Sequence, residues 1–194
     1  MRHYNDPLML RMLAAGRVAG VALAAMGAGA LAACSVTPAE PYVDKLDPDT
    51  ATTMTVLAEP VELVSDSLRT ANGDPFVYVA PFETDQMGAR ALYLWISVPQ
   101  NNGPVTQPKL LCDGREVEMQ PLGSDPAQLK LSRPPYSLPT PWSGQWFFQL
   151  PRNSLDCLVS AQAIEIDAQS SQGAMERFTT TAKALRPLQA FAHR

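Results

Sequence analysis

The stretch Ala91–Val98, ALYLWISV, carries the clearest secondary-structure signal of the chain. Every second residue from Leu92 to Val98 is aliphatic, and Tyr93, Trp95 and a serine stand between them. A period of two is that of a β-strand, in which alternate side chains point to opposite faces of the sheet. The stretch therefore predicts a strand with one aliphatic face toward a core and a second face that carries two aromatic side chains.

Short strand-like segments stand on both sides of this stretch. Asp113-Gly114 is a strong hairpin signal, because both residue types tolerate the positive φ of a tight turn. Pro60 interrupts the apolar run 54–64, which predicts an edge strand or two short pieces. The other expected strands are Phe76–Ala80, Lys109–Cys112 and Arg115–Gln120 around the turn, Gln128–Leu131, Gln145–Leu150, Ala163–Ala168 and Arg177–Ala182.

Two short helices are expected in the last third of the chain. Asn153, with Asp156 three residues later, is arranged like a capping box at a helix start. Leu185, Leu188 and Phe191 recur at three-residue spacing and predict a closing helix. Sequential strands joined by short turns favour a mainly β fold, either an antiparallel sandwich or a curved sheet, with one or two short C-terminal helices.

The composition of the 194 residues allows one globular domain and excludes several classes of protein. With 46% hydrophobic and 18% charged residues, the chain is not of the disordered type. A net charge of −4 argues against a basic nucleic-acid binder. The two histidines, His3 and His193, lie near the two ends, so the sequence offers no zinc ligand set and no His-dependent catalytic triad. No cofactor is expected.

The first 33 residues have the pattern of an export signal. Arg2, Arg11 and Arg17 precede the uncharged run VAGVALAAMGAGALAA at 18–33. This run is shorter than the about 20 residues that a membrane-spanning helix needs. We therefore expect a removable signal peptide in residues 1–33.

The uncharged run ends in Leu31-Ala32-Ala33-Cys34, which resembles the lipobox of bacterial lipoproteins. The resemblance implies that the Cys34 thiol receives a diacylglycerol (palmitate-type acyl chains), that the chain is cleaved before Cys34, and that the new amino group takes a further acyl chain. Two or three acyl chains anchor a protein stably. Ser35 replaces the aspartate that marks inner-membrane retention in enteric lipoproteins, which implies an outer-membrane anchor with the domain facing the periplasm.

The chain thus divides into a signal peptide (1–33), an acylated cysteine with a proline-rich, acidic tether (34–51), and one β-rich periplasmic domain (52–194). Without residues 1–33 the net charge is −6, because three arginines and one aspartate leave with them. The acyl chains, rather than charge, must therefore supply the affinity for a membrane.

Two groups of carboxylates are interpreted as solvated side chains. Asp44, Asp47 and Asp49 lack the spacing and the glycine of a calcium-binding loop. Glu116 and Glu118 would share the exposed face of one hairpin strand. Neither group is expected to bind a metal or to act as a catalytic acid–base pair.

Cys112 and Cys157 are the remaining two of the three cysteines. In an exported chain two such thiols normally oxidise to one disulfide. The bridge would close a loop of 46 residues, and no CxxC spacing suggests a redox pair.

A concentration of aromatic residues is the remaining candidate for a binding site. We favour the interpretation that these aromatic side chains form a second core layer beneath the proline-rich segment 132–142. The alternative is that Tyr93, Trp95, Trp142 and Trp146 form an exposed surface for a partner or ligand.

These observations predict a non-catalytic accessory protein of the bacterial cell envelope, anchored through Cys34 and bound to another envelope protein rather than to nucleic acid. The alternative function is that of a small-ligand or glycan-binding lipoprotein that uses the aromatic surface.

Overall fold

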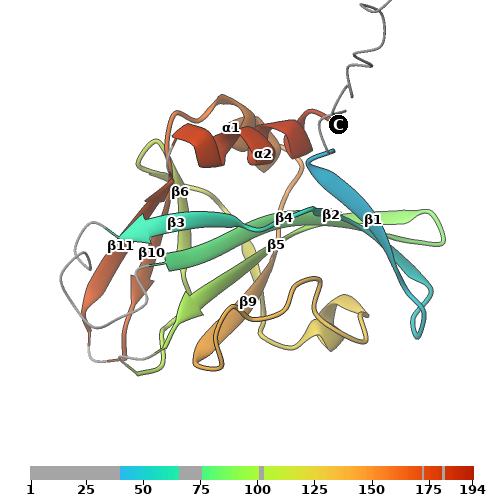
Figure 1. Cartoon of the computed structure of the whole chain (residues 1–194), viewed down its shortest axis with the longest axis horizontal. Coiled ribbons are helices and arrows are strands. Elements are labelled where there is room, and N and C mark those ends of the chain that lie inside the picture. Colours follow the sequence, from blue (N-terminus) through green and yellow to red (C-terminus); the bar gives the residue numbers. More distant parts are fainter. Residues whose placement is uncertain (1–39, 66–75, 101–102, 172, 181) are drawn as a thin grey trace, which may run out of the picture. The chain divides into compact units, whose positions relative to one another are not determined.

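The computed structural model describes residues 40–65, 76–100, 103–171, 173–180 and 182–194. Within these residues, eleven strands form one curled antiparallel sheet (Figure 1). The strands are β1 (Tyr42–Asp47), β2 (Thr52–Leu57), β3 (Val61–Ser65), β4 (Phe76–Gln86), β5 (Ala89–Pro99), β6 (Lys109–Cys112), β7 (Arg115–Glu116), β8 (Gln120–Gly123), β9 (Ser143–Gln149), β10 (Ile164–Gln169) and β11 (Met175–Thr180). The helices are the 3-10 helix η2 (Pro126–Leu129) and the α-helices α1 (Ser154–Ser160) and α2 (Ala182–Ala192).

The long hairpin of β4 and β5 is the centre of the sheet. β5 lies along one side of β4. On the opposite side, the first half of β4 pairs with β3 and the second half pairs with β2, which in turn pairs with β1. Apart from β1 and β2, the strands follow the order β7-β6-β10-β11-β3-β4-β5-β9-β8. The prediction of a mainly β fold is confirmed, and of the two architectures it allowed, the curved sheet is the one observed.

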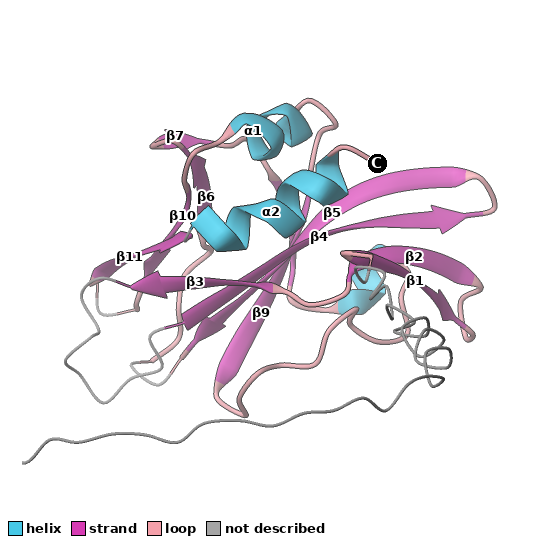
Figure 2. Ribbon diagram, turned by 45° about the horizontal axis from the view of Figure 1, so that its top comes forward, coloured by secondary structure: helices cyan, strands magenta, loops and turns pink. Residues whose placement is uncertain are grey.

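Both faces of the central strands are buried, because separate parts of the chain cover them. Helices α1 and α2 lie side by side on one side of the sheet, and the segment around η2 lies on the other (Figures 1 and 2). As the three-residue spacing predicted, Leu185, Leu188 and Phe191 of α2 are all buried, at most 5% exposed. Trp95 is only 1% exposed although it lies on the non-aliphatic face of β5.

The hairpin at Asp113-Gly114 forms as predicted, with φ of 48° and 76° at the two turn residues. The returning strand is shorter than expected, since β7 ends at Glu116. The chain then crosses to the other end of the sheet, where β8 pairs with β9. The expected strand Arg115–Gln120 is therefore wrong as one strand: residues 117–119 connect β7 to β8, and Gln120 begins β8.

The expected tether is wrong over its second half. Tyr42–Asp47 forms β1 and pairs residue by residue with β2, so the sheet begins at Tyr42 rather than near residue 52. Only Asp47 of β1 is buried, and an outer strand of this kind shows no alternation of apolar and polar residues. The apolar run 54–64 does form two short strands, on either side of Pro60.

The structure corrects two local expectations, the strand at 128–131 and the side-chain cap of the first helix. The expected strand Gln128–Leu131 does not form. Its first two residues end η2, because Pro126 favours a helical first turn and the Asp125 carboxylate accepts the Ala127 N–H. Helix α1 does follow Asn153, but the Asn153 side chain makes no capping hydrogen bond.

Candidate functional site

The four candidate aromatic residues do not lie on one surface. Trp95 faces the same side of the sheet as its cross-strand neighbour Phe147, whereas Trp146 pairs with Ile96 and faces the opposite side. Tyr93 is half-buried, with its ring centroid 5.4 Å from that of Phe82. Of these residues, Trp95 belongs to the core, and Tyr93 and Trp146 are partly buried against it.

Segment 132–142, which we call the Pro-rich cover, closes over the face that holds Trp95. Tyr136 of the cover is 7% exposed, and its ring centroid lies 5.1 Å from that of Trp95. The Tyr136 hydroxyl donates a hydrogen bond of 3.0 Å to the Leu57 carbonyl. Burial raises the pKa of this phenol far above its usual range. The second core layer weighed in the sequence analysis is therefore present.

Strand β1 holds the beginning of the Pro-rich cover in place. One Asp47 carboxylate oxygen accepts the Ser132 N–H at 2.6 Å, and the other accepts the Ser132 hydroxyl at 2.7 Å. The hydroxyl bond is the largest cause that lowers the Asp47 pKa. Lys45 donates to the Pro135 carbonyl at 3.1 Å. These bonds give Asp47 a structural role that the interpretation of a solvated linker missed.

The far end of the Pro-rich cover presents apolar side chains outward. Trp142 is 52% exposed and Leu138 is 40% exposed. Hydrogen bonds from the Gln100 N–H to the Trp142 carbonyl and from the Ser143 N–H to the Thr140 carbonyl fix the backbone here. An exposed tryptophan on a backbone fixed at both ends costs little entropy when it binds a partner. Of the four candidate aromatic residues, Trp142 is thus the one with a largely exposed side chain that a partner could contact.

Cys112 and Cys157 form the predicted disulfide, which joins the end of β6 to α1. Asp113 reinforces the same junction, since its carboxylate accepts the N–H groups of Gln162 and Ala163, both at 2.9 Å. The disulfide and these two hydrogen bonds therefore stabilise the junction between the end of β6 and the segment around α1.

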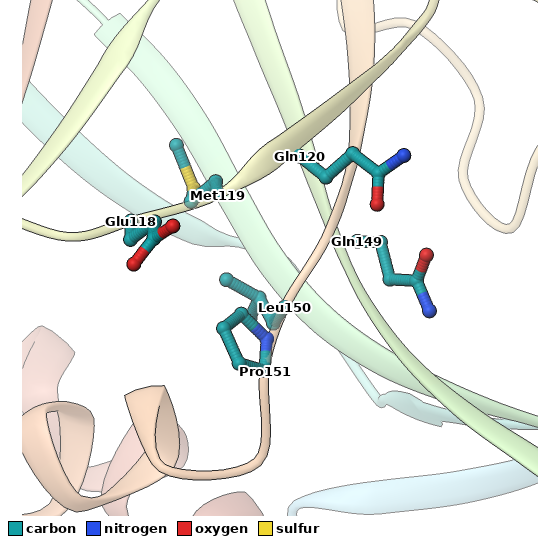
Figure 3. A pocket seen from close by; sticks show the side chains of 6 residues that line it. All are labelled: Glu118, Met119, Gln120, Gln149, Leu150 and Pro151. Carbon is teal, nitrogen blue, oxygen red and sulfur yellow. The ribbon is translucent and has the colours of Figure 1, made fainter.

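The carboxylates Glu116 and Glu118 have different surroundings. Glu116 forms an ion pair of 3.0 Å with Lys109. Glu118 borders a shallow pocket of about 360 Å³ beside Gln120 and Gln149, which Figure 3 displays with the other lining side chains. The pocket has no second titratable side chain in its lining, so this geometry supplies no acid–base pair.

A more polar groove, not foreseen from the sequence, lies where β1, β2, β4 and β5 adjoin. Glu83 lines this groove with a side chain 11% exposed, and Arg90 and Arg194 of the same lining form ion pairs with it. Because its side chains come from distant positions, only the register of the sheet could have indicated it.

Cys34, the expected acylation site, lies outside the described residues. Among the described residues, no helix has the length and hydropathy to cross a membrane, and no three His, Cys, Asp or Glu side chains are grouped to hold a metal ion. Comparison with protein families, with curated proteins and with solved structures finds no match for this chain.

Proposed function

We propose that this protein is a lipid-anchored accessory protein of the bacterial cell envelope, which acts by binding another envelope protein and not by catalysis. The anchor follows from the lipobox-like end of the uncharged run, Leu31–Cys34. The domain faces the periplasm from the outer membrane, as the serine after Cys34 implies.

The observation that carries the binding role is the exposure of Trp142 on the Pro-rich cover. Of the three tryptophans, all of them among the described residues, only Trp142 is exposed. Tryptophan is enriched among residues that dominate binding energy at protein interfaces. The hydrogen bonds of Asp47 and Tyr136 hold the cover against the sheet, so Trp142 is presented without a cost of ordering the loop.

The glycan-binding alternative loses the support of a continuous aromatic surface. Trp95 lies in the core, and Trp146 lies on the opposite face. Among these candidate aromatic residues a sugar ring would therefore find one exposed side chain, Trp142, instead of a platform.

The test is site-specific photo-crosslinking in living cells of the source organism. A benzophenone amino acid replaces Trp142 in the full chain, and Met87, 97% exposed at the tip of the β4–β5 hairpin, is the matched control position. We expect a light-dependent adduct of one defined mass at position 142 and none at 87. The same adduct at both positions, or none at 142, would contradict the proposal.

A second variant separates binding from folding. Trp142→Ala should abolish recovery of the cross-linked partner through a probe at Leu138, while the melting temperature stays within about a degree or two of the unsubstituted protein. A large fall in melting temperature would assign Trp142 to the core instead.

A further inference from the structure

The polar groove has a volume of about 420 Å³ and is built from two cross-strand rows. In the first row Asp44 of β1 lies opposite Thr55 of β2, and Thr55 lies opposite Glu83 of β4. Directly opposed residues of antiparallel strands share one face of the sheet. The row therefore lines up three polar side chains across three strands.

The second row lies two residues farther along β2 and β4, on the same face. Thr53 of β2 lies opposite Asp85 of β4, and Asp85 lies opposite Arg90 of β5. Residues two apart on a strand point to the same side, so the two rows form one polar surface. Tyr42 of β1, half-buried, borders this surface.

Three guanidinium groups gather on Glu83 in the first row. The distances from its carboxylate oxygens are 3.1 Å to Arg194, 3.5 Å to Arg152 and 3.9 Å to Arg90. The Arg194 guanidinium is also held over the ring of Phe191, at 4.5 Å from its centroid. Arg194 is thus held by packing as well as by charge, whereas Arg90 and Arg152 are held by their ion pairs.

Asp85 holds Arg90 from the second row. Its carboxylate accepts Arg90 Nε at 3.0 Å and the Gly88 N–H at 2.8 Å. The Gly88 hydrogen bond, followed by the one from Arg90, lowers the Asp85 pKa, so this carboxylate is ionised at neutral pH. The lining of the groove combines the carboxylates of Asp44, Glu83 and Asp85 with the guanidinium groups of Arg90 and Arg194, so both signs of charge stand side by side in it.

A ligand for this surface must satisfy fixed donors and fixed acceptors that stand side by side. The carboxylates would repel an anion, and the guanidinium groups would repel a cation. A hydroxyl group both donates and accepts, so it suits this arrangement, and hydrogen bonds to ionised partners are the stronger ones. A zwitterion would have to displace the existing ion pairs of Glu83 and Asp85.

We propose that this groove binds a neutral, hydroxyl-rich ligand, a saccharide, through the Asp44–Glu83 and Thr53–Arg90 rows, with the Tyr42 ring against the apolar face of a sugar. The site is separate from the Pro-rich cover. It depends neither on acylation of Cys34 nor on a protein partner at Trp142.

The experiment is an NMR titration of the isotopically labelled full chain in detergent micelles. The probes are three neutral tetrasaccharides, chitotetraose, cellotetraose and maltotetraose, each added up to its limit of solubility. We expect saturable shifts of the Thr53, Thr55 and Arg90 amide signals with at least one of them. Arg90→Gln should weaken that binding about tenfold or more, since it removes charge-assisted hydrogen bonds.

Arg177→Gln is the matched control. Arg177 likewise binds two carboxylates on a strand face, Asp167 at 2.6 Å and Glu165 at 3.4 Å, but it lies on β11 and does not line the groove. Its substitution should leave the dissociation constant unchanged. Should Arg90→Gln fail to fold, Thr53→Val serves in its place, because Thr53 is an exposed residue of the same row.

Three results would overturn the proposal. The first is the absence of groove shifts with all three tetrasaccharides. The second is stronger binding of inorganic phosphate or of the zwitterion alanyl-alanine in the groove, which would assign it to an anion or to a peptide. The third is an equal loss of affinity in Arg90→Gln and Arg177→Gln.

Discussion

The rings of Trp95 and Tyr136 pack against each other with centroids 5.1 Å apart and planes inclined at 41°. This contact joins the central strand β5 to the Pro-rich cover and buries the second face of the sheet. It also divides the tryptophans by role, since Trp95 is enclosed while Trp142, at the end of the same cover, remains exposed.

Trp95→Ala should lower the free energy of unfolding by about 3–5 kcal/mol, the usual cost of removing a buried large aromatic side chain. Trp142→Ala should change it by no more than about 0.5 kcal/mol, as for an ordinary surface substitution. Urea denaturation followed by circular dichroism measures both. Equal losses in the two variants would contradict the division of roles.

Tyr136→Phe should cost about 1 kcal/mol, because the Leu57 carbonyl would lose its 3.0 Å hydrogen bond inside the core. The ring packing against Trp95 would remain. Thermal melts of Tyr136→Phe and Tyr136→Ala compare the two contributions, and the alanine variant should melt lower. If the phenylalanine variant is as unstable as the alanine variant, the hydroxyl bond dominates and the ring contact contributes little.

Asp47 should make the Pro-rich cover sensitive to acid. Its folded-state pKa is lowered chiefly by the Ser132 hydroxyl, so its contribution to stability is present above the unfolded pKa near 3.8 and is lost as pH falls through the folded value. Asp47→Asn should therefore melt lower at pH 7 and flatten the fall in melting temperature below about pH 4. Glu118→Gln, on an exposed carboxylate, is the control and should leave this acid profile unchanged.

Replacement of both Cys112 and Cys157 by alanine should cost about 2–5 kcal/mol, because the disulfide closes a long loop in the unfolded chain. Chemical denaturation measures the loss. Peptide mapping without reductant, on protein taken from the envelope, should recover the linked pair; two free thiols in that protein would show that the bridge does not form there.

Metabolic labelling with a clickable fatty acid should mark the unsubstituted protein and not Cys34→Ala. The double alanine variant of Cys112 and Cys157 is the control, since it removes the other two cysteines and should keep the label. Equal labelling of Cys34→Ala would remove the basis for a lipoprotein.

Local sequence determined the elements whose signal lies between near neighbours. The alternation in Ala91–Val98 predicts β5, the positive φ tolerated by Asp113-Gly114 predicts the hairpin, and Leu185, Leu188 and Phe191 predict α2. Each signal depends on residues within a few positions of one another, so it can be recognised without knowing how the rest of the chain folds.

Tertiary structure decided which side chains cover each face and which strands adjoin. The sequence raised segment 132–142 as a cover, but nothing near Trp95 specifies that Tyr136 packs on it, and the acidic composition of Tyr42–Asp47 gave no sign of a strand paired to β2. The groove has the same origin, because its rows join residues such as Asp44, Thr55 and Glu83 only through the register of three strands. Register and face covering depend on contacts between distant segments, which local periodicity does not encode.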